Sequence, residues 1–134
     1  MQSILVDTGP LVALFKKRDE DHRRVTGFLK TIRCRLLTTW PVMTEAWHLV
    51  ALPSRLALMQ WAAAGLEICD LGERATDDLL RLLEKYKDRP MDLADASLVL
   101  LAEKTGVFDI MTIDRADFDA YRARGNIRFR QVLS

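Results

Sequence analysis

The sequence predicts an α/β fold, a three-layer α/β/α sandwich built on a small, mainly parallel β-sheet. Short apolar segments, typical of buried strands, alternate along the chain with longer segments of helical periodicity. None of the expected connections is a tight two-residue hairpin, so the strands are expected to be joined by helices and to run parallel. The length of 134 residues fits a single domain spanning residues 1–134.

Prolines mark helix starts in the first half of the chain, because proline fits the first turn of a helix. Pro10 follows the first expected strand, Pro41 follows the second, and Pro53 with Ser54 separates two helices. In order, we expect a strand at 3–6, helices at 10–17 and 19–31, a strand at 35–38, a helix at 41–52, and a further helix ending near Gly65.

The second half of the chain is divided by the helix-breaking segment 88–90 and by Gly106, which suits the end of a helix. The helix before Gly106 is apolar nearly all the way round, which predicts that it is buried on most faces. In order, we expect a strand at 66–71, helices at 73–87 and 92–104, a strand at 107–113, a short helical turn at 116–121 and a strand at 127–132.

Composition places few limits on function. Lysine and arginine (20) nearly balance aspartate and glutamate (19), so no overall basic field indicates nucleic-acid binding. The two cysteines, Cys34 and Cys69, lie far apart without metal-ligand spacing and are expected to be free thiols of a cytoplasmic protein. No segment approaches the roughly 20 apolar residues that cross a membrane.

Two aspartates directly follow expected strands. Asp7 comes after the first strand, and Asp114 comes after the strand at 107–113. Because ligands bind beyond the carboxyl ends of parallel strands, both side chains are expected at one edge of the sheet. Aspartate also commonly caps the start of a helix, which explains either residue on its own equally well.

Two further carboxylates lie in otherwise apolar segments. An isolated charge at Asp95 would cost several kcal/mol unless it is paired, protonated or bound to a cation. A capping box formed with Asp92 is the alternative, but it explains one hydrogen bond and not the apolar surroundings. Glu45 lies one turn into a helix rich in core residues. The alternative to a functional role for Glu45 is a favourable interaction of its charge with the helix dipole.

Carboxylates that gather at one edge raise one another's pKa, and a divalent cation resolves that conflict. The two histidines, His22 and His48, show no metal-binding spacing. Oxygen ligands alone suit Mg²⁺ or Mn²⁺ rather than zinc. Such an ion can activate water and stabilise the attacking and leaving oxygens of a phosphodiester.

Four blocks of this sequence stand in a recognisable order. They are residues 4–14 (ILVDTGPLVAL), the pair Thr44-Glu45, residues 91–99 (MDLADASLV) and residues 111–118 (MTIDRADF). Their order and spacing resemble the PIN-domain family, and in particular the VapC-type toxins of toxin–antitoxin pairs. The resemblance extends over essentially the whole chain.

The resemblance implies a PIN-like domain that acts as a Mg²⁺- or Mn²⁺-dependent endoribonuclease, forms a homodimer and is inhibited by a cognate antitoxin protein. It places the family's acidic quartet on Asp7, Glu45, Asp95 and Asp114, and we expect the three aspartates to bind the metal. Whether Asp92 or Asp95 is the primary ligand stays open. The expected supporting residues are Thr8, Asp92, Thr112 and Asp117.

Basic side chains form two groups that could contact phosphates of an RNA substrate. The first group is Lys16, Lys17 and Arg18, and the second includes Arg122 and Arg124. The alternative for each group is a solvated surface with no ligand.

Two other functions compete with the nuclease hypothesis. The first is a non-catalytic PIN-like module that binds proteins and takes part in autoregulation. The second is a Mg²⁺-binding receiver domain, which would need paired acids after the first strand and a lysine after a late one. Only Asp7 follows the first strand and no such lysine is present, so the nuclease is favoured.

Overall fold

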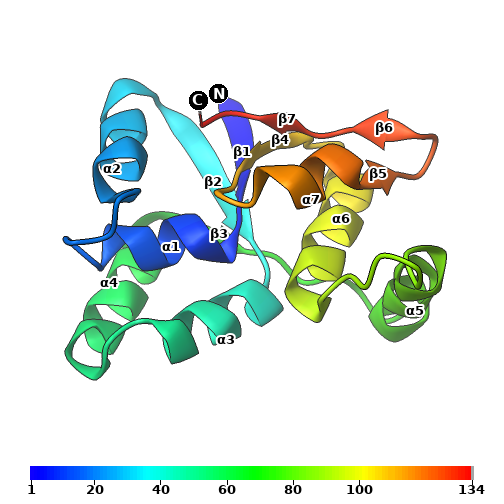
Figure 1. Cartoon of the computed structure of the whole chain (residues 1–134), viewed down its shortest axis with the longest axis horizontal. Coiled ribbons are helices and arrows are strands. Elements are labelled where there is room, and N and C mark those ends of the chain that lie inside the picture. Colours follow the sequence, from blue (N-terminus) through cyan, green and yellow to red (C-terminus); the bar gives the residue numbers. More distant parts are fainter. Residues whose placement is uncertain (134) are drawn as a thin grey trace.

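The computed structural model describes residues 1–133 and has five parallel strands in one sheet, in the order β3-β2-β1-β4-β7 (Figure 1). Helices cover both faces of this sheet, so the predicted three-layer α/β/α fold is confirmed. The strands are β1 (Gln2–Val6), β2 (Cys34–Thr38), β3 (Leu66–Ile68), β4 (Asp109–Met111) and β7 (Arg130–Gln131).

The most deeply buried helix is α6, as its apolar sequence predicts. Its residues 94–102 are all buried, and it packs against α3 and α5, while α1 packs against α2 and α3. The helices are α1 (Thr8–Leu14), α2 (His22–Thr31), α3 (Trp40–Leu49), α4 (Arg55–Gly65), α5 (Ala75–Lys85), α6 (Leu93–Thr105) and α7 (Arg115–Ala120), with a 3₁₀ turn η1 (Leu52–Ser54). Within residues 1–133, no helix is both long and apolar enough to cross a membrane.

Strand register brings the ends of three strands together. Val6 at the end of β1 pairs with Met111 at the end of β4, which places Asp7 beside Thr112. On the other side of β1, the hydroxyl of Thr38 at the end of β2 donates to the backbone carbonyl of Val6 at 2.8 Å. The loops that follow these strands therefore leave the sheet at the same edge.

The prediction of one strand over residues 127–132 is wrong. Residues 127–128 form β6 (Ile127–Arg128), which pairs antiparallel with β5 (Arg122–Ala123), and only β7 joins the main sheet. Gly125 (φ 83°) and Asn126 (φ 61°) supply the left-handed backbone that the short loop of this hairpin needs. The Gly-Asn pair was the available signal, but strands of two residues are too short to show periodicity.

Candidate active site

A pocket of about 490 Å³ lies where these loops leave the sheet. The loop after β1, the segment between α1 and α2, the middle of α3, the start of α6 and the loop after β4 all contribute to its wall. Thr8, Gly9 and Ile113 are among the uncharged lining residues. Its acidic lining residues are Asp7, Asp19, Asp21, Glu45, Asp92, Asp95 and Asp114. We call this the acidic pocket.

Asp7 is held rigidly between β1 and α1. Its side chain is buried, with one oxygen accepting from the Thr8 amide at 2.8 Å and the other from the Thr112 hydroxyl at 2.7 Å. The helix-capping role considered from the sequence is therefore present, but it uses only one of the two oxygens. Burial raises the pKa of Asp7 to about 6, against the lowering effect of these two hydrogen bonds, and Asp92 and Glu45 add to the rise.

Asp95 lies in the first turn of α6 and is only 9% exposed. Its amide donates to the Asp92 carboxylate at 2.8 Å, so Asp92 caps the helix as the alternative interpretation requires. The Asp95 carboxylate itself accepts from the Tyr121 hydroxyl at 2.9 Å. Burial raises the pKa of Asp95 to about 8, and the nearby charges of Asp7 and Asp92 add to this effect.

A buried hydrogen bond joins the helices that carry Glu45 and Asp95. Thr39 caps the start of α3, and its hydroxyl lies 2.6 Å from that of Ser97 on α6. Since the Ser97 hydroxyl donates to the Ala94 carbonyl, Thr39 supplies the hydrogen between them. Glu45 is half-buried on this helix, and its pKa is raised by burial and then by the charge of Asp92.

Asp114 lies at the exposed rim of the acidic pocket, at the start of α7. Its amide donates to the Thr112 hydroxyl at 3.1 Å. A hydrogen bond with Asp117 raises the pKa of Asp114 and lowers the pKa of Asp117. Asp117 also forms an ion pair with Arg89 at 2.7 Å, so the charge of Asp117 is neutralised by this arginine.

The predicted basic residues divide between two places. Lys16, Lys17 and Arg18 are exposed in the segment between α1 and α2 that also contributes Asp19 and Asp21 to the acidic pocket. The Arg122 guanidinium donates to backbone carbonyls at the end of α7, and Arg124 lines a different hollow. The structure therefore brings only the first basic group close to the acidic pocket.

Three residues of the site were not identified from the sequence. Asp19 and Asp21 were interpreted only as the charged start of a helix, although they line the acidic pocket. Tyr121 was placed at the end of a helical turn, and no sequence pattern connects it with Asp95. These contacts depend on how separate segments pack, which local periodicity does not encode.

The chemistry of the acidic pocket fits a hard divalent cation, because its ionisable lining groups are all carboxylates. Thr8 adds a buried hydroxyl without a hydrogen-bond partner within residues 1–133. Within residues 1–133, no three side chains of aspartate, glutamate, histidine or cysteine lie close enough together to hold an ion directly. Mg²⁺ usually keeps several of its waters and binds only one or two carboxylates, so this spacing is compatible with it.

Comparison with known proteins decides the family. Residues 4–124 match the sequence model of the PIN domain. The chain belongs to the PIN-domain family. It is 30% identical to ribonuclease VapC26 of Mycobacterium tuberculosis over 134 residues, which cover 96% of this chain and 99% of that protein. The family recognised in the sequence is therefore confirmed, and the receiver-domain alternative is excluded.

Solved structures of PIN-domain toxins share the fold. VapC20 of Mycobacterium tuberculosis, described as a toxin that cleaves the sarcin-ricin loop, superposes with a TM-score of 0.72 at 19% identity, covering 83% of this chain and 89% of that one. A chain of a toxin–antitoxin complex from Klebsiella pneumoniae gives a TM-score of 0.67 at 19% identity, covering 87% and 91%. At these identities the likeness supports the fold alone.

Proposed function

We propose that this chain is an endoribonuclease of the PIN-domain toxin class, which hydrolyses RNA phosphodiester bonds with the help of Mg²⁺ or Mn²⁺. The observation that carries the proposal is the burial of Asp7 and Asp95 in one pocket, where neither has a basic partner within residues 1–133. Two buried acids with raised pKa values are unfavourable in a purely structural site and are typical of functional ones. The 30% identity to a ribonuclease over nearly the whole chain supports the same activity.

The three aspartates Asp7, Asp95 and Asp114 are the residues that would hold the cation, directly or through its coordinated waters, with Asp92 as a further candidate. PIN-domain ribonucleases generally depend on a divalent metal, and carboxylate ligands without histidine favour Mg²⁺ or Mn²⁺. When bound, such an ion lowers the pKa of a coordinated water and stabilises charge that develops on the phosphate.

The other residues of the acidic pocket have separate roles in this mechanism. The Thr112 hydroxyl fixes one oxygen of Asp7 and thereby orients this carboxylate. Glu45 faces the pocket from α3, and its raised pKa suits a group that accepts a proton from the attacking water. Lys16, Lys17 and Arg18 would attract the phosphates of the RNA beside the acidic centre.

A cognate antitoxin and a second copy of the chain are the protein partners that we propose, acting in the cytoplasm. Large apolar side chains exposed on α3, η1 and α4 support a protein-binding surface there: Trp40, Trp47, Leu49, Leu52 and Leu56. Another hollow, lined by Trp40, Thr44 and Leu93, shares Glu45 and Asp92 with the acidic pocket. A partner on this surface would therefore lie close to the site of cleavage.

Cleavage of a mixed RNA pool tests the proposal. The wild-type protein should cleave RNA with Mg²⁺ or Mn²⁺ and stop on addition of EDTA. Asp95→Asn should reduce the rate by at least about 100-fold, since it removes a negative charge from the centre of the site. Asp77→Asn is the matched control, because Asp77 is an exposed aspartate on α5 and does not line the acidic pocket.

Equal cleavage by the wild-type protein and Asp95→Asn would overturn the assignment of the site. No cleavage under any metal condition, together with binding of a protein partner, would favour the non-catalytic alternative.

A further inference from the structure

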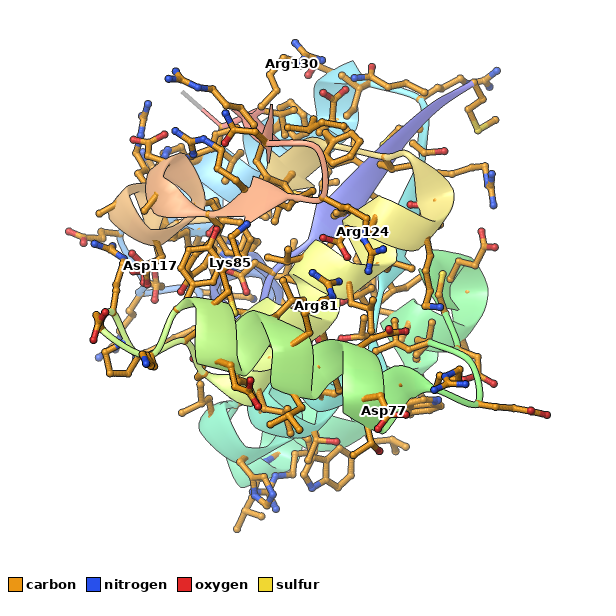
Figure 2. All side chains as sticks on the ribbon, turned by 90° about the vertical axis from the view of Figure 1, so that its right-hand side faces the viewer. Asp77, Arg81, Lys85, Asp117, Arg124 and Arg130 are labelled. Atoms are coloured by element: carbon orange, nitrogen blue, oxygen red, sulfur yellow. The ribbon has the colours of Figure 1, made fainter. Side chains whose placement is uncertain are left out.

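A second hollow, of about 520 Å³, lies at the opposite end of α6 from the acidic pocket. It is bounded by α5, the last turns of α6 and the β5–β6 hairpin, and it shares no lining residue with the acidic pocket. Figure 2 faces this side of the molecule. Three cations line it, one from each of these elements: Arg81, Lys104 and Arg124. We call it the basic hollow.

The donors of the basic hollow are only partly satisfied by the protein. Arg124 donates its backbone amide to Glu103 at 2.7 Å, but its guanidinium makes no hydrogen bond or ion pair within residues 1–133. Arg81 pairs with Glu103 through one end of its guanidinium, while its Nε is buried and has no acceptor in this part of the chain. Lys104 pairs with Asp78 at 3.6 Å. Three cations thus face two acids, and an oxyanion would satisfy the remaining donors.

The basic hollow is positioned to meet a long ligand that is bound in the acidic pocket. Lys104 is nine residues beyond Asp95 on the same helix, a rise of roughly 13 Å. In Figure 2, Lys85 lies between Asp117, which hydrogen-bonds to the pocket residue Asp114, and Arg81. Lys85 and Arg81 of α5 thus place positive charge on the side of the molecule that carries the basic hollow.

We propose that the basic hollow binds a phosphate of single-stranded RNA whose scissile bond lies in the acidic pocket. The guanidinium of Arg124 and the ammonium of Lys104 donate to the phosphate oxygens. Phe108, which is half-buried, and Ile127 give the adjoining ribose or base an apolar surface. This proposal rests on the proposed ribonuclease function and assigns that activity a second substrate contact.

Binding of RNA as a function of salt tests the contact without requiring cleavage. A labelled single-stranded RNA is titrated by fluorescence anisotropy into Asp95→Asn protein with Mg²⁺, over a range of KCl concentrations. Loss of one phosphate contact lowers the slope of log K against log salt by about 0.7 for single strands. Arg124→Gln in this background should show that decrease, with affinity reduced about fivefold.

The control is Arg128→Gln, which removes an exposed arginine of the same hairpin that does not line the basic hollow. It should change the slope and the affinity much less than Arg124→Gln. Lys104→Gln is a second variant at the α6 side of the hollow and should weaken binding in the same direction as Arg124→Gln. Both hollow residues lie at the surface, so circular dichroism should show the parent fold in each variant.

An unchanged slope of log K against log salt for Arg124→Gln overturns the proposal. Equal losses of RNA affinity in Arg124→Gln and Arg128→Gln also overturn it, because they would indicate attraction of RNA to the positive surface as a whole. Tight binding of adenosine monophosphate that is lost in Arg124→Gln would assign the basic hollow to a free nucleotide instead. Failure of the wild-type protein to cleave any RNA would overturn the proposed function but not the binding result, so the two failures are distinguishable.

Discussion

Two nearly buried carboxylates on the same helix have opposite surroundings. Glu103, in the last turns of α6, has a side chain that is 8% exposed and accepts from both the Arg81 guanidinium and the Arg124 amide. Asp95, in the first turn, is equally buried, but among residues 1–133 its carboxylate has only the Tyr121 hydroxyl as a donor, and it faces other acids. Arg81 neutralises the charge of Glu103, whereas no cationic side chain of residues 1–133 pairs with Asp95.

Burial alone therefore does not identify a functional acid in this fold. Glu103 fixes α5 and the β5–β6 hairpin to α6, which is a structural role. Within residues 1–133 Asp95 gains no comparable ion pair, so its buried charge is either avoided by protonation or offset by a bound cation. The difference predicts that the two residues respond oppositely to metal, to substitution and to pH.

The largest expected effect is metal-dependent stabilisation. MnCl₂ at about a hundredfold excess over its Kd should raise the free energy of unfolding of the wild-type protein by about 3 kcal/mol. Asp95→Asn should lose most of this gain, and Glu103→Gln should keep it. Urea unfolding with and without the metal measures the effect. An equal gain in the wild-type protein and Asp95→Asn would show that the cation binds elsewhere.

Substitution without metal should separate the two carboxylates next. Glu103→Ala leaves Arg81 without its ion pair and should lower the free energy of unfolding by about 2 kcal/mol. Asp95→Asn should leave the stability of the metal-free protein unchanged or raise it, because asparagine can still accept from Tyr121 and carries no charge. Thermal unfolding in EDTA gives both values. A large loss for Asp95→Asn would favour a purely structural role.

A smaller effect is expected from the hydroxyl that contacts Asp95. Tyr121→Phe keeps the ring contacts with Tyr86 and Phe118, whose centroids lie 5.3 and 5.2 Å away, but removes the hydrogen bond. Because donors of this kind orient metal ligands, affinity for Mn²⁺ should fall about tenfold. Isothermal titration calorimetry measures it. Wild-type affinity in this variant would remove Tyr121 from the site.

The last expected effect is a pH dependence of the metal-free protein. With pKa values of about 6 for Asp7 and about 8 for Asp95, the folded protein binds more protons than the unfolded chain from about pH 4 to pH 8. Its stability should therefore fall as pH rises through this range. We expect Tm in EDTA to be higher at pH 5 than at pH 8. In Asp95→Asn the difference should shrink, and a Tm that rises with pH would contradict the assignment.

The sequence predicted the α/β/α layers and the position of Asp95 for a physical reason. Asp95 is a charged residue inside an apolar helix, and the apolar residues that surround it are its neighbours in the sequence. Its burial could therefore be predicted from local sequence alone. The strand-end position of Asp7 and Asp114 follows from topology, once the parallel arrangement is accepted. These features depend on periodicity and chain order, which the sequence contains directly.

Features that depend on packing between distant segments could not be predicted in this way. The contribution of Asp19 and Asp21 to the acidic pocket requires the segment between α1 and α2 to fold toward α6. The β5–β6 hairpin and the basic hollow likewise require strands of two residues to pair beside α5. The family resemblance implied the roles of the four acidic residues, but it did not imply that Asp19, Asp21 or the hairpin would lie where they do.

The bond between Thr112 and Asp7 joins residues that are 105 positions apart, and Tyr121 reaches Asp95 from later still in the chain. During synthesis, a chain that has not yet extended past Thr112 and Tyr121 has neither the orienting hydroxyl of Asp7 nor the partner of Asp95. The pocket therefore completes only after Tyr121 has been made. A copy that ends before these residues carries most of the acidic residues but lacks the two hydroxyls that hold Asp7 and Asp95, so we expect no nuclease activity from it.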